Sequence, residues 1–138
     1  MELQLLKPLV CGLIVLALWP LAAQADCSNM HGAQIALMSS SYDPDVLVWD
    51  SQKRLSSYAA NSYEVAKLLL PHALLARAGT LGIIITCKRN VVHAKYHFSA
   101  SDVVSVRMTS GEYRGRNGWV MMDDVHVVAD RATHRRHP

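Results

Sequence analysis

The sequence has few of the residues that mark catalytic or metal sites. Of its 138 residues, 3 are cysteines, and the two that lie beyond residue 25, Cys27 and Cys87, do not form a Cys-x-x-Cys pair. Two cysteines are too few for a structural zinc site. No Gly-x-Ser-x-Gly segment, which would present a catalytic serine on a sharp turn, occurs in the sequence. The composition therefore gives no support to a redox, structural-zinc or serine-hydrolase function.

Concentrated positive charge is also missing. The formal net charge is +3, and three of the positive charges, Arg131, Arg135 and Arg136, lie in the last eight residues. The rest of the chain is nearly balanced, whereas a protein that binds nucleic acid shows basic residues gathered on one face. We therefore expect no nucleic-acid partner.

Long apolar runs are limited to one segment near the start. After Lys7, residues 9–21 are apolar except for Gly12 and Pro20, and the small-residue pattern Ala23-Gln24-Ala25 follows. This layout is typical of a secretory signal peptide, and the run is too short for a membrane span. We expect residues 1–25 to be cleaved near Ala25. The mature chain would then have no membrane span and would work in the periplasm or outside the cell.

The cysteines fit this compartment. Removing 25 of the 138 residues leaves 113, which is enough for one domain, and Cys11 leaves with the signal peptide. Cys27 and Cys87 remain, and thiols oxidise outside the cytoplasm. We expect one disulfide between them, worth up to roughly 4 kcal/mol on the chain-entropy model.

The first half of the mature chain predicts little regular structure. Residues 46–49 form a short apolar run after a Pro-Asp turn and predict a buried strand. Residues 63–70 have apolar side chains at helical spacing after the capping candidates Asn61 and Ser62, and Pro71 would end the helix. This predicts one short helix of about two turns. Residues 52–62 are compatible with either a helical turn or a loop.

From residue 78 onward the apolar period changes to two, which is typical of strands. The strands are expected at Leu81–Cys87, Val91–Phe98, Val103–Met108, Trp119–Met122 and Val125–Val128, with turns at Lys88–Asn90 and Asp123–Asp124. Five short strands with one small helix describe a mainly β protein, a small barrel or sandwich. Residues 129–138 have no apolar pattern and are expected to form a flexible tail.

The C-terminal strands carry a family resemblance. Residues 103–108, the segment 110–120 with its Gly118-Trp119-Val120 sequence, and Asp123-Asp124-Val125 resemble the end of a bacterial SH3-like domain. The resemblance covers about residues 78–128 and implies a small SH3-like barrel, across which Trp119 would bury its ring. Residues 26–77 have no place in a minimal domain of this kind. We therefore expect them to be an N-terminal arm and short helix packed on the barrel.

The same segment supplies the candidate binding site. Secreted domains of this resemblance often bind cell-wall peptides or other proteins, although fold does not fix function. Tyr113, Arg114, Arg116 and Trp119 lie in or beside a glycine-rich loop, and guanidinium groups beside aromatic rings suit a carboxylate or a peptide. The alternative is that Trp119 belongs to the core and that the two arginines are a solvated turn.

The histidines give no sign of a metal site or a catalytic base. His93 and His97 are about 13 Å apart along an extended strand, too far to share one metal ion. We therefore expect no metal, no cofactor and no enzymatic activity. The sequence predicts a secreted or periplasmic, non-catalytic binding module for protein or cell-wall peptide. An inhibitor or immunity-type protein of a secreted enzyme is one alternative, and an unrecognised envelope hydrolase is another.

Overall fold

The computed structural model describes residues 27–93 and 100–129, so the predicted signal peptide and most of the predicted tail lie outside the described residues. The strands are β1 (Gln34–Leu37), β2 (Asp45–Trp49), β3 (Ala73–Arg77), β4 (Leu81–Val92), β5 (Ser101–Met108), β6 (Asn117–Met121) and β7 (Val125–Ala129). The helices are α1 (Gln52–Ala60) and α2 (Tyr63–Ala66), with the 3₁₀ helices η1 (Cys27–Met30), η2 (Lys67–His72) and η3 (Met122–Asp124).

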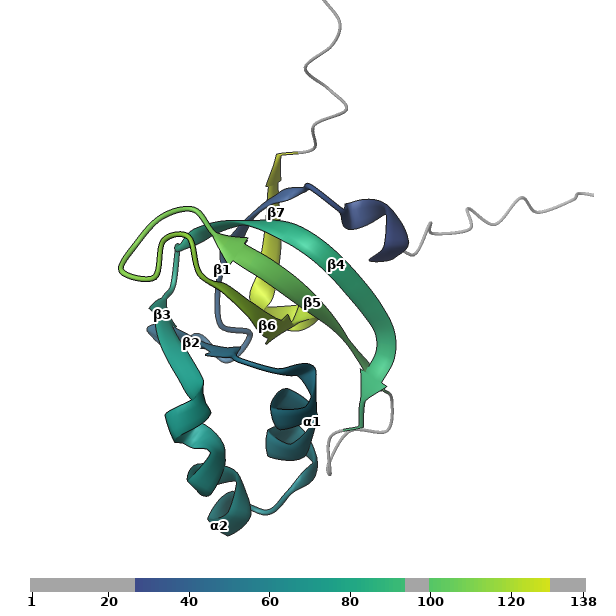
Figure 1. Ribbon diagram of the computed structural model, residues 1–138, viewed down its shortest axis with the longest axis vertical. Coiled ribbons are helices and arrows are strands. Elements are labelled where there is room, and N and C mark those ends of the chain that lie inside the picture. Colours follow the sequence, from purple (N-terminus) through teal and green to yellow (C-terminus); the bar gives the residue numbers. More distant parts are fainter. Residues whose placement is uncertain (1–26, 94–99, 130–138) are drawn as a thin grey trace, which may run out of the picture.

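The strands form one curled antiparallel sheet in the order β3-β2-β6-β5-β4-β1-β7 (Figure 1). The prediction of a mainly β fold is confirmed. The sheet has seven strands where about five were expected, because strands from before residue 78 pair with those that follow it. β1 lies between β4 and β7, and β2 pairs with β6 through Trp49 and Trp119. The predicted appendage and the predicted barrel are therefore parts of the same sheet.

Strand β3 was not predicted at all. Its sequence, Ala-Leu-Leu-Ala-Arg, contains no β-branched or aromatic residue, and alanine is depleted in strands. The strand forms because it pairs along its whole length with β2, from Ala73 opposite Trp49 to Arg77 opposite Asp45. Pairing with a distant segment has overridden a weak local preference.

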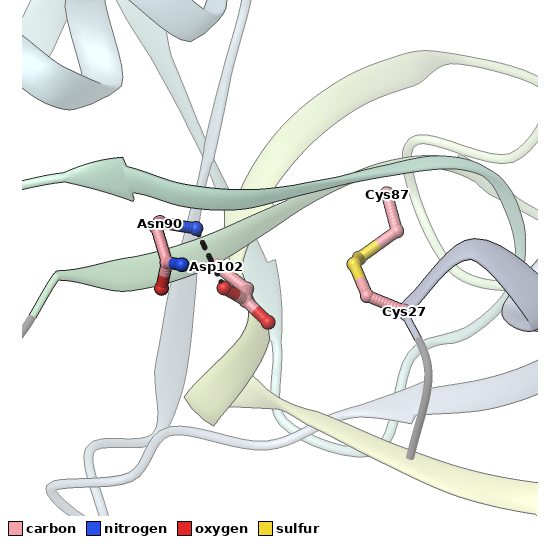
Figure 2. Close-up of a disulfide and its surroundings, with 4 residues drawn as sticks. All are labelled: Cys27, Cys87, Asn90 and Asp102. Atoms are coloured by element: carbon pink, nitrogen blue, oxygen red, sulfur yellow. Dashed lines mark hydrogen bonds between the residues drawn. A yellow bond between two sulfur atoms is a disulfide. The ribbon is translucent and has the colours of Figure 1, made fainter. Parts of the chain in front are cut away.

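The predicted turn at Lys88–Asn90 is wrong, because β4 runs through these residues to Val92. The polar segment is an irregularity within the strand: the β4–β5 register shifts between Lys88 and Val92, and Asn90 has a φ of 52°. The backbone N–H of Asn90 donates to Oδ1 of Asp102 at 2.8 Å, so a side chain of β5 stabilises it (Figure 2). Of the predicted strand at 91–98, the first two residues belong to β4, and residues 94–98 lie outside the described residues.

The structure has two short α-helices where one was expected. Residues 52–60 form α1, whose N-cap Ser51 accepts a hydrogen bond from the backbone N–H of Arg54 at 3.2 Å. The predicted helix at 63–70 is present as α2 followed by η2, and η2 continues through Pro71 to His72. In Figure 1 these helical segments lie together below the sheet.

The buried side chains form two clusters on opposite faces of the sheet. The larger one fills the curl of the sheet and contains Ile35, Leu37, Val46, Val48, Ala76, Ile84, Val104, Val106, Met108, Val120 and Val125. The smaller one joins Trp49, Val92 and Val103 to Leu55 of α1. Adjacent residues of β5 belong to different clusters, as the alternation of side chains along a strand requires.

The sulfur atoms of Cys27 and Cys87 lie at disulfide distance, as the cysteine count predicts, and their Cα atoms are 5.5 Å apart (Figure 2). Cys27 begins η1 and is buried, so the pair attaches the start of the described chain to β4. His31 adds a contact of its own, from Nδ1 to the carbonyl oxygen of Ile85. Among the described residues, no helix has the length and apolar character to cross a membrane.

Candidate functional site

The glycine-rich segment that the sequence singles out is the loop between β5 and β6, residues 109–116. The N–H of Gly115 donates to the carbonyl of Met108 at 2.7 Å, and the N–H of Met108 donates to the carbonyl of Arg116 at 2.9 Å. Gly111 and Gly115 have φ values of 76° and 85°, which other residues rarely adopt. The loop is therefore closed by backbone hydrogen bonds between its two ends.

The base of this loop is also bonded to the start of β4. The N–H of Thr109 donates to the carbonyl of Leu81 at 2.8 Å, and the N–H of Leu81 donates to Oγ of Ser110 at the same distance. Two bonds across different segments hold the loop in place relative to the sheet. The loop thus presents its side chains from a fixed position.

The structure does not bring the four predicted binding residues together. Tyr113 is half-buried and packs against the larger core cluster, so it fills part of the curl of the sheet. Arg114 and Arg116 are exposed on the same loop. Trp119 lies three residues after Arg116, in β6, and packs on the other face of the sheet.

Trp119 is half-buried rather than central, which corrects the expectation that its ring crosses the barrel. In β6 it is Gly118 and Val120 that are buried, and only Val120 adds a side chain to the larger cluster. Trp119 faces the opposite way and packs against the smaller cluster. Nζ of Lys88 lies 5.4 Å from the centre of its ring.

Arg116 lines a hollow of about 170 Å³. Its walls come from the end of β2, the junction of η2 with β3, and the start of β6; they are Val48, Trp49, Asp50, Pro71, His72, Ala73, Leu74, Arg116 and Asn117. The predicted arginine therefore belongs to a concave site, but its neighbours there differ from those that the sequence suggested.

Asp50 and His72 are the functional candidates that sequence reasoning missed. They are 22 residues apart in the chain, and the β2–β3 pairing joins them: the N–H of Asp50 donates to the carbonyl of His72 at 3.3 Å. Nδ1 of His72 lies 3.8 Å from Oδ2 of Asp50. The only signal for Asp50 in the sequence is its place directly after the predicted strand at residues 46–49. That signal gives no indication that His72 lies beside it.

Of the charged side chains that line the hollow, Asp50 has a partner of opposite charge and Arg116 has none among the described residues. Asp50 forms an ion pair with Arg54 of α1, so its carboxylate already has a cationic partner. Oδ1 of Asn117 accepts a hydrogen bond from Nε of Arg107 at 3.1 Å, which leaves the amide nitrogen of Asn117 as a donor. Within residues 27–93 and 100–129, Arg116 has no acidic side chain within ion-pair distance. The hollow therefore offers donors to a carboxylate.

In the described part of the chain, no three His, Cys, Asp or Glu side chains gather as metal ligands would. His93 is exposed, and His97 lies outside the described residues.

Comparison with known proteins adds no relative: no family model matches the chain, and neither a curated protein nor a solved structure is significantly similar to it.

Proposed function

We propose that the mature chain is a non-catalytic binding module that acts in the periplasm or outside the cell and holds a protein or cell-wall peptide through a carboxylate at the Arg116 hollow. The resemblance of residues 78–128 to SH3-like domains supports a binding function. Two sulfur atoms at disulfide distance are in keeping with an oxidising compartment.

The observation that carries the proposal is the position of Arg116. Arg116 is one of the residues that line the hollow, where Asp50 is paired with Arg54, while no acid of the described residues pairs with Arg116 itself. A guanidinium binds a carboxylate through two parallel hydrogen bonds, so this geometry suits an acidic group of a partner. Arg114, two residues earlier on the same loop, is a second exposed positive charge.

Replacing both arginines, Arg114→Ala with Arg116→Ala, is expected to reduce the envelope material retained by the tagged mature chain about tenfold, the effect of roughly 1.4 kcal/mol of binding free energy. The measurement is a pull-down from the native cell envelope, with the bound material quantified after a salt wash.

Lys53→Ala with Arg89→Ala is the matched control, because it removes two exposed positive charges that line none of the hollows described. We expect the control to retain as much material as the unmodified chain. Equal retention by the Arg114/Arg116 variant would remove this site from consideration, and equal loss in both variants would indicate a non-specific charge effect.

A further inference from the structure

Strand β3 lies at the end of the sheet order and pairs with β2 alone. The bonds that flank the pair show which residues face β2: the N–H of Ala78 donates to the carbonyl of Pro44 at 2.9 Å, and the N–H of Asp50 donates to that of His72 at 3.3 Å. In an antiparallel pair, hydrogen-bonded positions alternate with non-bonded ones. Ala73, Leu75 and Arg77 therefore direct their backbone groups away from β2.

Some of these outward groups are bonded within the chain. The N–H of Ala73 donates to the carbonyl of Leu70, and the carbonyl of Arg77 accepts from the backbone N–H and Oγ1 of Thr80. The N–H and carbonyl of Leu75, the carbonyl of Ala73 and the N–H of Arg77 have no such bond within residues 27–93 and 100–129. Together they make an unpaired row along the outer edge of the strand.

A second hollow, of about 280 Å³, lies at this edge. Leu75, Ala76 and Arg77 form one wall, and Gly111, Glu112 and Tyr113 of the loop form another, with Thr80 between them. The side chain of Leu75 is 57% exposed, a large apolar group beside the unpaired row. The strand and the loop thus bound a space in which a chain has access to both backbone and side-chain contacts.

We infer that the outer edge of β3 receives an extended peptide of a partner protein as an added strand. This inference rests on the proposed function and names the way in which the partner is held. Backbone pairing would supply affinity, and alternate side chains of the peptide would supply specificity. An aliphatic residue would contact Leu75 or Tyr113, and an acidic residue would face Arg77.

The edge favours a single peptide over a second copy of this chain. β3 has five residues, follows Pro71 and ends at a charged residue, Arg77. Short strands and charged ends hinder pairing between two sheets of the same kind. In addition, Glu112 and Tyr113 of the loop line the other side of the hollow at this edge, so an added strand would lie between β3 and the loop.

The test begins with random dodecapeptides displayed on phage, selected against the disulfide-bonded mature chain. A synthetic peptide of the selected sequence is then added, and amide hydrogen exchange of the chain is followed by NMR. We expect exchange at the amides of Leu75 and Arg77 to slow at least tenfold. N-methylation of every second peptide residue should weaken binding about tenfold, and N-methylation of the intervening residues should have little effect.

Failure to enrich any peptide, or a bound peptide that leaves exchange at Leu75 and Arg77 unchanged, would overturn strand addition. The two proposals fail separately. Loss of envelope binding by the Arg114/Arg116 variant, with no protection of Leu75, would leave the proposed function standing without this mode of binding. Protection of Leu75 together with unchanged envelope binding by that variant would support strand addition at β3 and would contradict the role of the Arg116 hollow.

Discussion

Replacing Gly118 with alanine is expected to lower the free energy of unfolding by about 3 kcal/mol, the upper end of the usual cost of overpacking a core. A Cβ at this position would collide with Cγ1 of Val48 and would lie 3.0 Å from the carbonyl oxygen of Trp49. β6 passes this close to β2 only because Gly118 has no side chain. Urea denaturation of residues 26–138 measures the loss.

Val48→Ala supplies the internal control, because Cγ1 of Val48 is one of the two atoms in the way. In the double variant, the loss should be smaller than the sum of the two single losses by at least about 0.5 kcal/mol, the coupling typical of residues in contact. Strictly additive losses, or an unchanged stability of Gly118→Ala, would contradict the close approach of β6 to β2.

Removing the disulfide is expected to lower the free energy of unfolding by about 4 kcal/mol at most. Cys27 and Cys87 are separated by 60 residues, and cross-linking a loop of this length restricts the unfolded chain by that amount on the entropy model. The measurement is denaturation of residues 26–138 with and without a thiol reductant.

The variant Cys27→Ala with Cys87→Ala controls for effects of the reductant on the rest of the chain. Its unfolding transition should be lower than that of the oxidised chain and should not shift further when reductant is added. An oxidised chain whose transition is insensitive to reductant would contradict the pairing.

Regular alternation allowed the C-terminal strands to be predicted from sequence. β6 alternates buried residues with more exposed ones, and β5 does so from Val104 to Met108. The predicted ranges of β5, β6 and β7 differ from the observed ones by at most two residues at either end. The sequence of β3 has no such pattern. Its alanines and leucines also favour a helix, so they do not indicate a strand. Only its pairing with β2 distinguishes it.

Polar residues were misleading where a distant side chain stabilises them. Lys88–Asn90 has the composition of a turn, yet β4 continues, with Asp102 of the neighbouring strand bonded to Asn90. In the same way, Trp119 was expected at the centre because of its size. Trp119 precedes Val120, whose side chain packs in the larger cluster, and neighbouring side chains of a strand point to opposite faces. The ring of Trp119 therefore packs against the smaller cluster.

Half of the candidate site could be predicted. The glycines of the loop and its two arginines are adjacent in the chain, so their local pattern was sufficient to indicate them. Asp50 and His72 join Arg116 only through the pairing of β2 with β3 and the one-pair contact of β2 with β6. No local pattern contains that information.

Site-specific photo-cross-linking tests most directly whether the loop and β3 form the binding face. The variant Glu112→p-benzoylphenylalanine places the reactive group in the loop beside β3, and Tyr63→p-benzoylphenylalanine places it on exposed α2, which lines none of the hollows described. After irradiation in the native envelope, we expect a covalent adduct from the Glu112 position and none from the Tyr63 position. An adduct from Tyr63 alone, or from neither position, would contradict the proposed face.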